Sequence, residues 1–258
     1  LLVGVGGMGK QSLSKLATYT AGYTVFQIVI SATYGVNDLK TDLQTMYRKC
    51  GIKGEGMSFL FTDAQITDEK FLVFMNDLLS SGNVPGLFPP EEQDDIINAV
   101  RPACKRAGVQ DTRDNVWQFF INQVKANLHV LLCFSPIGDP IRVRARRFPA
   151  LVNCVVIDWF QSWPEEALYS VSKRFLEPED LGSDEAKASV VNFMPYSFLQ
   201  VDKAGERYFS QERRYNYTTP KSFLELIALY RSMLGRRRSS TNLLIERYVN
   251  GGRSSRPP

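Results

Sequence analysis

Five short apolar runs alternate along the chain with longer segments in which apolar residues recur at helical spacing. Runs of this length, bounded by polar or turn-forming residues, predict β-strands. They cover residues 1–5, 24–30, 58–62, 128–134 and 155–157. Strands that alternate with helices are typical of a parallel sheet wrapped by helices on both faces. The pattern therefore predicts the α/β class, with a three-layer αβα arrangement.

The helical patterns divide the chain further. Between the third and fourth strands, turn residues at 81–90 precede expected helices at about 91–105 and 114–127, the second with Trp117, Phe120, Ile121 and Val124 as its core face. Beyond Trp159 only helical patterns follow, at 164–176, 186–213, 220–234 and 241–250. We expect a large α/β subdomain over residues 1–158 with an insertion at about 83–127. An all-helical lid subdomain over 159–250 and a disordered tail at 251–258 follow.

Composition narrows the function classes. The 258 residues are 44% hydrophobic, which is ordinary for a folded domain, and the net charge of +4 is too small to indicate nucleic-acid binding. The sequence lacks the roughly 18 consecutive apolar residues that a membrane span needs. We therefore expect neither nucleic acid nor a membrane as a partner. The chain begins inside a strand without an initiator Met, so it is interpreted as a fragment.

Cysteine and histidine add little chemistry. The four cysteines, which have no paired spacing, are expected to be reduced and buried: Cys50, Cys104, Cys133 and Cys154. His129 is the only histidine, which excludes a histidine metal cluster or a serine-type triad. We expect it to be a packed strand residue.

The first apolar run leads into a glycine-rich loop. Gly4, Gly9 and Lys10 have the spacing of the phosphate-binding motif Gly-x-x-x-x-Gly-Lys-[Ser/Thr]. Such a loop turns backbone N–H groups toward an anion at a helix N-terminus, while the lysine reaches the outer phosphates. The predicted nucleotide-binding residues are Gly4, Gly6, Gly7, Met8, Gly9, Lys10, Gln11 and Ser12. The alternative is a glycine turn that serves only tight packing.

The loop departs from the motif at one position. Gln11 stands where a hydroxyl is expected, and Ser12 comes one residue late. Leu13, Leu16 and Ala17 then follow as part of an amphipathic helix, the setting that the motif requires. The sequence predicts binding of a nucleotide phosphate and leaves hydrolysis open.

The third strand ends in an acid. Asp63 follows an apolar run, and in phosphate-loop enzymes such an aspartate holds Mg²⁺. The next residue is ordinarily a glutamate that polarises the attacking water, but here it is Ala64, followed by Gln65, and alanine has no proton acceptor. Alternatively, Asp63 only caps the next helix. Asp68 and Glu69 are either substitute bases or first-turn helix acids.

A second strand end contributes Ser135. The residue at this position commonly orients the attacking water in such enzymes, and serine is a shorter side chain than the usual asparagine. Since Pro136 follows, simple turn chemistry is the alternative.

Longer motifs give a resemblance to a known family. They are Val84-Pro-Gly-Leu-Phe88, Phe148-Pro-Ala-Leu-Val-Asn153, Asp158-Trp-Phe-Gln-Ser-Trp163 with Ala167-Leu168, and Arg213-Arg-Tyr-Asn-Tyr-Thr-Thr-Pro-Lys-Ser-Phe-Leu-Glu225. With residues 4–12 and 59–65 they resemble a dynein heavy chain, specifically the fourth AAA+ module of the motor ring in axonemal forms. The resemblance covers about residues 1–250.

The resemblance implies a module in a ring of six, with ATP or ADP and Mg²⁺ bound between its sheet, its lid and the next module. Lys221 matches the lid position that touches nucleotide, although it also fits a solvated first-turn charge. Three arginines match the region of the finger that reaches a neighbouring module: Arg144, Arg146 and Arg147. A solvated basic face is the alternative for each of them.

The resemblance also implies partners: neighbouring modules of the same chain, microtubules through a stalk that this sequence lacks, and dynein intermediate and light chains through the parent. It places the parent in the cytoskeleton of the ciliary or flagellar axoneme. Three hypotheses remain: a nucleotide-binding regulatory module with little or no hydrolysis, a nucleotide-free structural segment, and an active ATPase with Glu69 as a non-standard base.

Overall fold

The computed structural model describes residues 1–31 and 33–254, with side chains described as far as residue 250. The chain forms two compact units, Leu1–Gln161 and a second unit that begins at Ser162. The phosphate-loop motif and Asp63 fall in the first unit, whereas Lys221 falls in the second.

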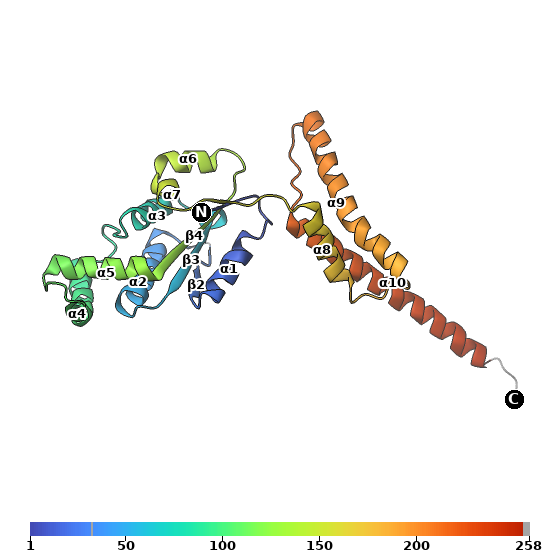
Figure 1. The fold of residues 1–258 in the computed structure, drawn as a ribbon, viewed down its shortest axis with the longest axis horizontal. Coiled ribbons are helices and arrows are strands. Elements are labelled where there is room, and N and C mark those ends of the chain that lie inside the picture. The colour runs from blue at the N-terminus through green and yellow to red at the C-terminus, as the bar shows by residue number, and fades with distance from the viewer. Residues whose placement is uncertain (32, 255–258) are drawn as a thin grey trace. The chain divides into compact units, whose positions relative to one another are not determined.

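The first unit is built on a parallel sheet of five strands in the order β2-β3-β4-β1-β5 (Figure 1). The strands are β1 (Leu2–Val3), β2 (Thr24–Gln27), β3 (Met57–Thr62), β4 (Leu128–Phe134) and β5 (Asp158–Trp159). All the pairings are parallel, and β3 is buried along its whole length. The predicted α/β class is therefore confirmed. Because the strands run in one direction, the residues that follow β1, β3 and β4 meet at one edge of the sheet.

Helices cover both faces of this sheet (Figure 1). In chain order they are α1 (Lys10–Thr20), α2 (Val36–Ile52), the 3₁₀ turn η1 (Asp63–Gln65), α3 (Lys70–Ser80), α4 (Pro90–Arg106), α5 (Arg113–Asn127), α6 (Pro140–Arg147) and α7 (Ala150–Asn153). Helix α1 packs on one face against β2, β3 and β4, while α2 and α5 pack together on the other, with α4 against them. These are the three layers predicted from the sequence.

The segment interpreted as an insertion is part of the main core. Val84, Leu87 and Phe88 are buried in the same cluster as the side chains of β3 and β4, and the ring of Phe88 packs edge-on against Trp117. On α5, three of the four predicted core residues are buried, and Val116 is buried in place of the partly exposed Trp117.

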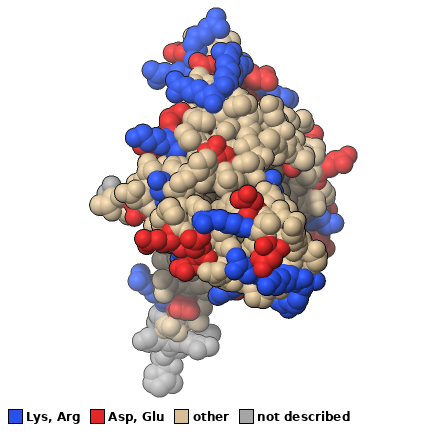
Figure 2. Space-filling model, turned by 90° about the vertical axis from the view of Figure 1, so that its left-hand side faces the viewer, with Lys and Arg blue, Asp and Glu red and all other residues tan. Residues whose placement is uncertain are grey.

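Charged side chains of both signs lie side by side on the face shown in Figure 2. Among the ion pairs of the first unit, Arg48 joins α2 to Glu92 of α4, and Arg113 of α5 joins Asp94 of α4. In the described part of the chain, the structure contains no helix with the length and apolar character needed to cross a bilayer.

Helix α1 buries a face that the apolar pattern did not predict. Leu13 and Leu16 are 52% and 59% exposed, whereas Ser14 and Thr18 are buried. The buried hydroxyls donate hydrogen bonds to the helix carbonyls of Lys10 and Ser14, at 2.9 and 2.8 Å, so their burial leaves no donor unpaired. Small side chains on this face allow α1 to lie close to the sheet, with Ser14 Oγ 3.9 Å from Cys133 Sγ.

The fifth strand lies a few residues later than predicted. Its ladder comprises Asp158 and Trp159, opposite Leu2 and Val3, because β1 offers only these two partners. The apolar run at 155–157 therefore lies outside the paired strand. The first unit ends at Gln161, two residues after this strand.

Two of the predictions for single residues have different outcomes. Cys154 is exposed, contrary to prediction, because it caps the short helix α7 and does not lie within a strand; the other three cysteines are buried. His129 does lie in β4, where its ring stacks on Tyr23 with centroids 4.8 Å apart.

The second unit consists of three helices, α8 (Glu165–Leu176), α9 (Asp184–Glu212) and α10 (Pro220–Ser254), among the residues described. Its core comprises Leu168, Leu176, Val191, Met194, Phe223 and Ile227. Helix α9 is continuous, and its last turn is closed by Arg213 in the left-handed conformation at φ 55°.

Helix α10 differs from the prediction of two helices and a tail. It runs without interruption from Pro220 to Ser254, so the predicted gap at 235–240 is helical. Residues 251–254, assigned to the disordered tail, continue the helix, and residues 255–258 lie outside the described part. Gly235 is the only helix-breaking residue type between 235 and 240, and a single glycine disfavours a helix by only about 1 kcal/mol, which neighbouring turns offset.

Candidate nucleotide site at the carboxyl edge of the sheet

The glycine-rich loop joins β1 to α1. Gly7 and Gly9 have φ angles of 87° and 90°, a left-handed backbone that side chains disfavour. A Cβ on Gly4 would lie 2.7 Å from Phe160 Cβ, so the segment after β5 requires a glycine there. A Cβ on Gly6 or Gly9 would meet no atom within 4 Å. The loop therefore has a turn backbone that favours glycine, with free space beside two of its glycines.

Lys10 begins α1 and bends back over the loop. Its Nζ donates hydrogen bonds to the carbonyls of Gly4 and Val5, at 2.5 and 2.9 Å. Burial lowers the pKa of Lys10, whereas the nearby Cys133 and Asp63 act in the opposite direction. Met8 is half-buried, and Gln11 and Ser12 are exposed in the first turn of α1. The predicted loop residues thus lie together around a helix N-terminus, which favours an anion.

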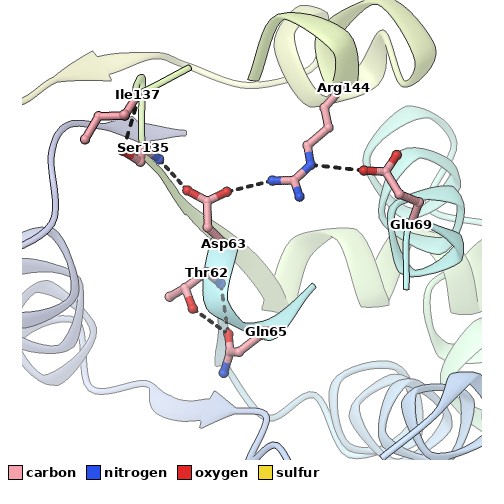
Figure 3. Close-up of polar contacts among 7 residues, drawn as sticks. All are labelled: Thr62, Asp63, Gln65, Glu69, Ser135, Ile137 and Arg144. Carbon is pink, nitrogen blue, oxygen red and sulfur yellow. Dashed lines mark hydrogen bonds and ion pairs between the residues drawn. The ribbon is translucent and has the colours of Figure 1, made fainter. Parts of the chain in front are cut away.

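Asp63 lies at the adjacent strand end, in the first position of η1. Its Oδ2 accepts a hydrogen bond from the backbone N–H of Ser135 at 2.5 Å, and its Oδ1 accepts one from Arg144 Nη1 at 2.8 Å (Figure 3). The ends of β3 and β4 and helix α6 therefore converge on one carboxylate. This geometry goes beyond simple capping of the next helix.

Ser135 contacts Asp63 through its backbone. Its hydroxyl instead accepts a hydrogen bond from the N–H of Ile137 at 3.4 Å, as in a serine turn (Figure 3). The turn chemistry that the sequence offered as an alternative is therefore present. The predicted role in orienting water stays a prediction.

Gln65 has a structural role that the sequence analysis did not assign. It is only 5% exposed; its Oε1 accepts from the N–H and hydroxyl of Thr62 at 2.8 and 3.3 Å, and its Nε2 donates to the Ile28 carbonyl at 2.6 Å. This side chain ties the end of β3 to the segment after β2 and forms η1. The spacing Thr-x-x-Gln, a capping box, was the available sequence signal.

The two acidic residues that follow Ala64, Asp68 and Glu69, also form contacts within the chain. Glu69 lies 3.5 Å from Arg144 Nε and 3.5 Å from Arg147 Nη1, each measured to a carboxylate oxygen. Asp68 accepts a hydrogen bond from the N–H of Lys70 at the start of α3, which is the role of a helix-start acid. Arg144 is largely buried, with 14% of its side chain exposed, whereas Arg146 is exposed on α6.

Lys221 lies in the first turn of α10 in the second unit. Its side chain is 70% exposed, and its Nζ lies 3.7 Å from Glu225 on the next turn of the helix. Within its own unit this residue has the environment of a solvated helix-start charge, the alternative named above.

The side chains at this edge of the sheet offer few ligands to a magnesium ion. In the described residues the structure contains no cluster of three or more side chains suited to hold a metal. Asp63 is one carboxylate beside the phosphate loop, and Mg²⁺ in nucleotide sites is commonly bound by one or two carboxylates together with phosphates and water. Both oxygens of that carboxylate already accept hydrogen bonds, from Ser135 and Arg144, so the side chains as they lie do not fit a directly bound Mg²⁺.

The αβα layers, the glycine loop with its lysine, the strand-end aspartate and the helical second unit define a P-loop module of the AAA+ class. Comparison with known proteins makes the class specific. Residues 1–233 match the family described as the P-loop containing dynein motor region D4.

Curated relatives agree with this match. The chain is 55% identical to the dynein alpha chain of the flagellar outer arm from Chlamydomonas reinhardtii, over 97% of its own length. It is 53% identical to a ciliary dynein beta chain from Heliocidaris crassispina and 53% identical to human dynein axonemal heavy chain 17, again over 97% of its length. The chain therefore belongs to the dynein heavy chains of the axonemal type. It spans 6% of the length of each of these relatives.

Proposed function

We propose that this chain is a nucleotide-binding AAA+ module that holds ATP or ADP as a regulatory or structural ligand and hydrolyses it very slowly or not at all. The main support is that none of the residues after Asp63 that could serve as a catalytic base is available for that role. Ala64 has no proton acceptor, Gln65 is used inside the fold, and Glu69 is ion-paired with two arginines. Loss of a general base lowers a rate by about 10²- to 10⁴-fold.

Binding is supported by different residues from those that hydrolysis needs. The loop at 4–9 and the N-terminus of α1 offer backbone N–H groups, and Lys10 offers a positive charge beside them. When phosphate binds, Lys10 exchanges its bonds to two loop carbonyls for phosphate oxygens. Asp63, the Mg²⁺ ligand expected from the sequence, is bonded to Ser135 and Arg144 instead.

In the parent protein, this module would be the fourth of a ring of six, in keeping with the family description that its match carries. An arginine such as Arg146 or Arg147 would reach the nucleotide of a neighbouring module. The relatives carry flagellar, ciliary and axonemal names, so we assign the parent to the axoneme. Its proposed partners are microtubules and the dynein intermediate and light chains.

The test uses the intact heavy chain, with the phosphate loops of its other modules disabled. Lys10→Ala should lower the amount of ATP or ADP that copurifies with the protein by at least about tenfold, since it removes the only side-chain charge of the loop. Lys15→Ala on the exposed side of the same helix is the matched control and should leave nucleotide content unchanged. Phosphate release by the unsubstituted module at the rate of an ordinary AAA+ ATPase would refute the proposal.

A nucleotide-free structural segment is the second candidate. It is favoured by the contacts of Lys10 and Asp63, both of which are already satisfied within the chain. Equal nucleotide content in the unsubstituted protein and in Lys10→Ala would support it. The third hypothesis, an ATPase with Glu69 as base, requires that Glu69→Gln abolish turnover, and the two ion pairs of Glu69 argue against it.

A further inference from the structure

Arg144 is placed where the proposed site would receive a metal ion. Its Nη1 donates to Asp63 Oδ1 at 2.8 Å, while the other carboxylate oxygen is held by the backbone N–H of Ser135 (Figure 3). Both oxygens of the Asp63 carboxylate are thus engaged by donors from the chain itself. A cation that binds Asp63 directly must compete with the guanidinium for the Oδ1 lone pairs.

The position of Arg144 is well defined by its surroundings. Only 14% of its side chain is exposed, its Cζ lies 5.9 Å from the centre of the Phe134 ring, and its Nε lies 3.5 Å from Glu69. It extends from α6 across to the ends of β3 and β4, between two acids. Buried, multiply bonded arginines of this kind lose little further side-chain entropy on forming the pair.

The charges of this cluster already balance. Asp63 and Glu69 supply two negative charges, and Arg144 and Arg147 supply two positive ones. A divalent cation would therefore enter a neutral cluster beside a guanidinium, and like charges at this range repel in a partly buried site. Lys10 adds a further positive charge on the loop side of Asp63.

A second metal contact is also altered. The position after Lys10, whose hydroxyl binds Mg²⁺ in the phosphate-loop motif, is occupied by Gln11, which is exposed in the first turn of α1. This fold ordinarily binds a metal through two side chains. In this chain, one of these positions is Gln11, which has no hydroxyl, and the other is Asp63, which is paired with Arg144. Neither change removes the backbone N–H groups that bind phosphate.

We propose that Arg144 is a tethered counterion of Asp63 that takes the place of the metal and makes nucleotide binding at this site nearly independent of Mg²⁺. The inference rests on the proposed nucleotide-binding function and specifies its ligand as the metal-free nucleotide. Arg144 acts through Asp63 and is in this sense a positioning residue. Release of Arg144 from Asp63 is the change that would admit Mg²⁺.

The experiment measures the coupling between metal and nucleotide in the intact heavy chain with its other phosphate loops disabled. The dissociation constant of a fluorescent ATP analogue is determined in EDTA and in excess Mg²⁺. The constant in EDTA divided by the constant in Mg²⁺ reports how strongly the metal supports binding. The variants are Arg144→Gln, Arg144→Lys, Asp63→Asn with Arg144→Gln, and Arg142→Gln. Arg142 is exposed on the same helix and serves as the matched control.

We expect the unsubstituted protein and Arg142→Gln to give a ratio within about threefold of one. Arg144→Gln should raise the ratio by about tenfold or more, the worth of one hydrogen bond to a charged group. Arg144→Lys, which keeps the charge, should retain a low ratio. Adding Asp63→Asn to Arg144→Gln should abolish the gain, because the effect passes through that carboxylate.

Two patterns would overturn the inference, and they differ from each other. If Arg144→Gln weakens binding equally with and without Mg²⁺, Arg144 contacts phosphate directly and is not a counterion of Asp63. A ratio well above one in the unsubstituted protein, unchanged in Arg144→Gln, likewise rejects the inference but leaves nucleotide binding intact. If no variant binds nucleotide in either condition, the proposed function fails, and the inference fails with it.

Discussion

The role of Gln65 can be tested by replacing it with leucine. Gln65→Leu keeps nearly the same side-chain volume in a position that is 5% exposed, so it creates little cavity. It removes three hydrogen bonds, two accepted from Thr62 and one donated to the Ile28 carbonyl. The buried groups of Thr62 and Ile28 are left without this partner, while leucine adds some apolar burial.

The expected magnitude follows from these contacts. Three hydrogen bonds contribute about 1 kcal/mol each, and a buried polar group left unpaired costs about 1–3 kcal/mol more. Leucine offsets roughly 1–2 kcal/mol through its apolar surface. The end of β3 should therefore lose about 2–5 kcal/mol of local stability, which corresponds to an increase of about 30- to 4,000-fold in hydrogen exchange when exchange follows local opening.

Hydrogen-exchange mass spectrometry of peptides that cover residues 57–66, in the intact heavy chain, measures this loss. Gln118→Leu is the matched control, because Gln118 is an exposed glutamine of α5 whose Nε2 donates a hydrogen bond to Asn122 on the next turn. That change should alter exchange by less than about threefold, as expected for surface substitutions. An increase below about threefold for Gln65→Leu, equal to the control, would refute the structural role given to this residue.

Three further predictions concern the first unit. Ala64→Glu restores a carboxylate beside Asp63 and should raise phosphate release by at least about tenfold; unchanged release with retained nucleotide would show that the missing base is not limiting. Gly51→Ala places a Cβ 2.2 Å from a carbon of the buried Phe120 ring, and should destabilise the unit by about 1–3 kcal/mol, measurable as a lower melting temperature. Cys154 is exposed, whereas burial raises the pKa of Cys50 to about 11, so a maleimide at pH 8 should label Cys154 first.

Some of the fold and site follows from local sequence. The strands were predictable because buried parallel strands are short continuous apolar runs, and the loop at 4–9 was predictable because its glycines adopt a backbone that few other residues tolerate. The same reasoning recognised Asp63 at a strand end and the missing proton acceptor at Ala64. These features depend on neighbours within a few residues, so they can be predicted from the local sequence.

The remaining features depend on contacts between distant segments. Helix α1 buries Ser14 and Thr18 rather than Leu13 and Leu16, because the close approach of the sheet, and not the apolar pattern, selects the buried face. Helix α10 passes through Gly235 without a break, although local signals predicted two helices. In α1, packing outweighed the apolar pattern; in α10, residues 235–250 are exposed, and the neighbouring helical turns offset the cost of one glycine, about 1 kcal/mol.

The sequence by itself therefore determined that this protein carries a phosphate loop and lacks the usual base beside it, because both are properties of single positions in a local motif. Only the tertiary structure decided what surrounds Asp63. Gln65 meets Ile28 across 37 residues of sequence, and Arg144 meets Asp63 across 81. Such pairs form only when parallel strands bring their carboxyl ends to one edge of the sheet, and it is there that an arginine meets the carboxylate a metal would bind.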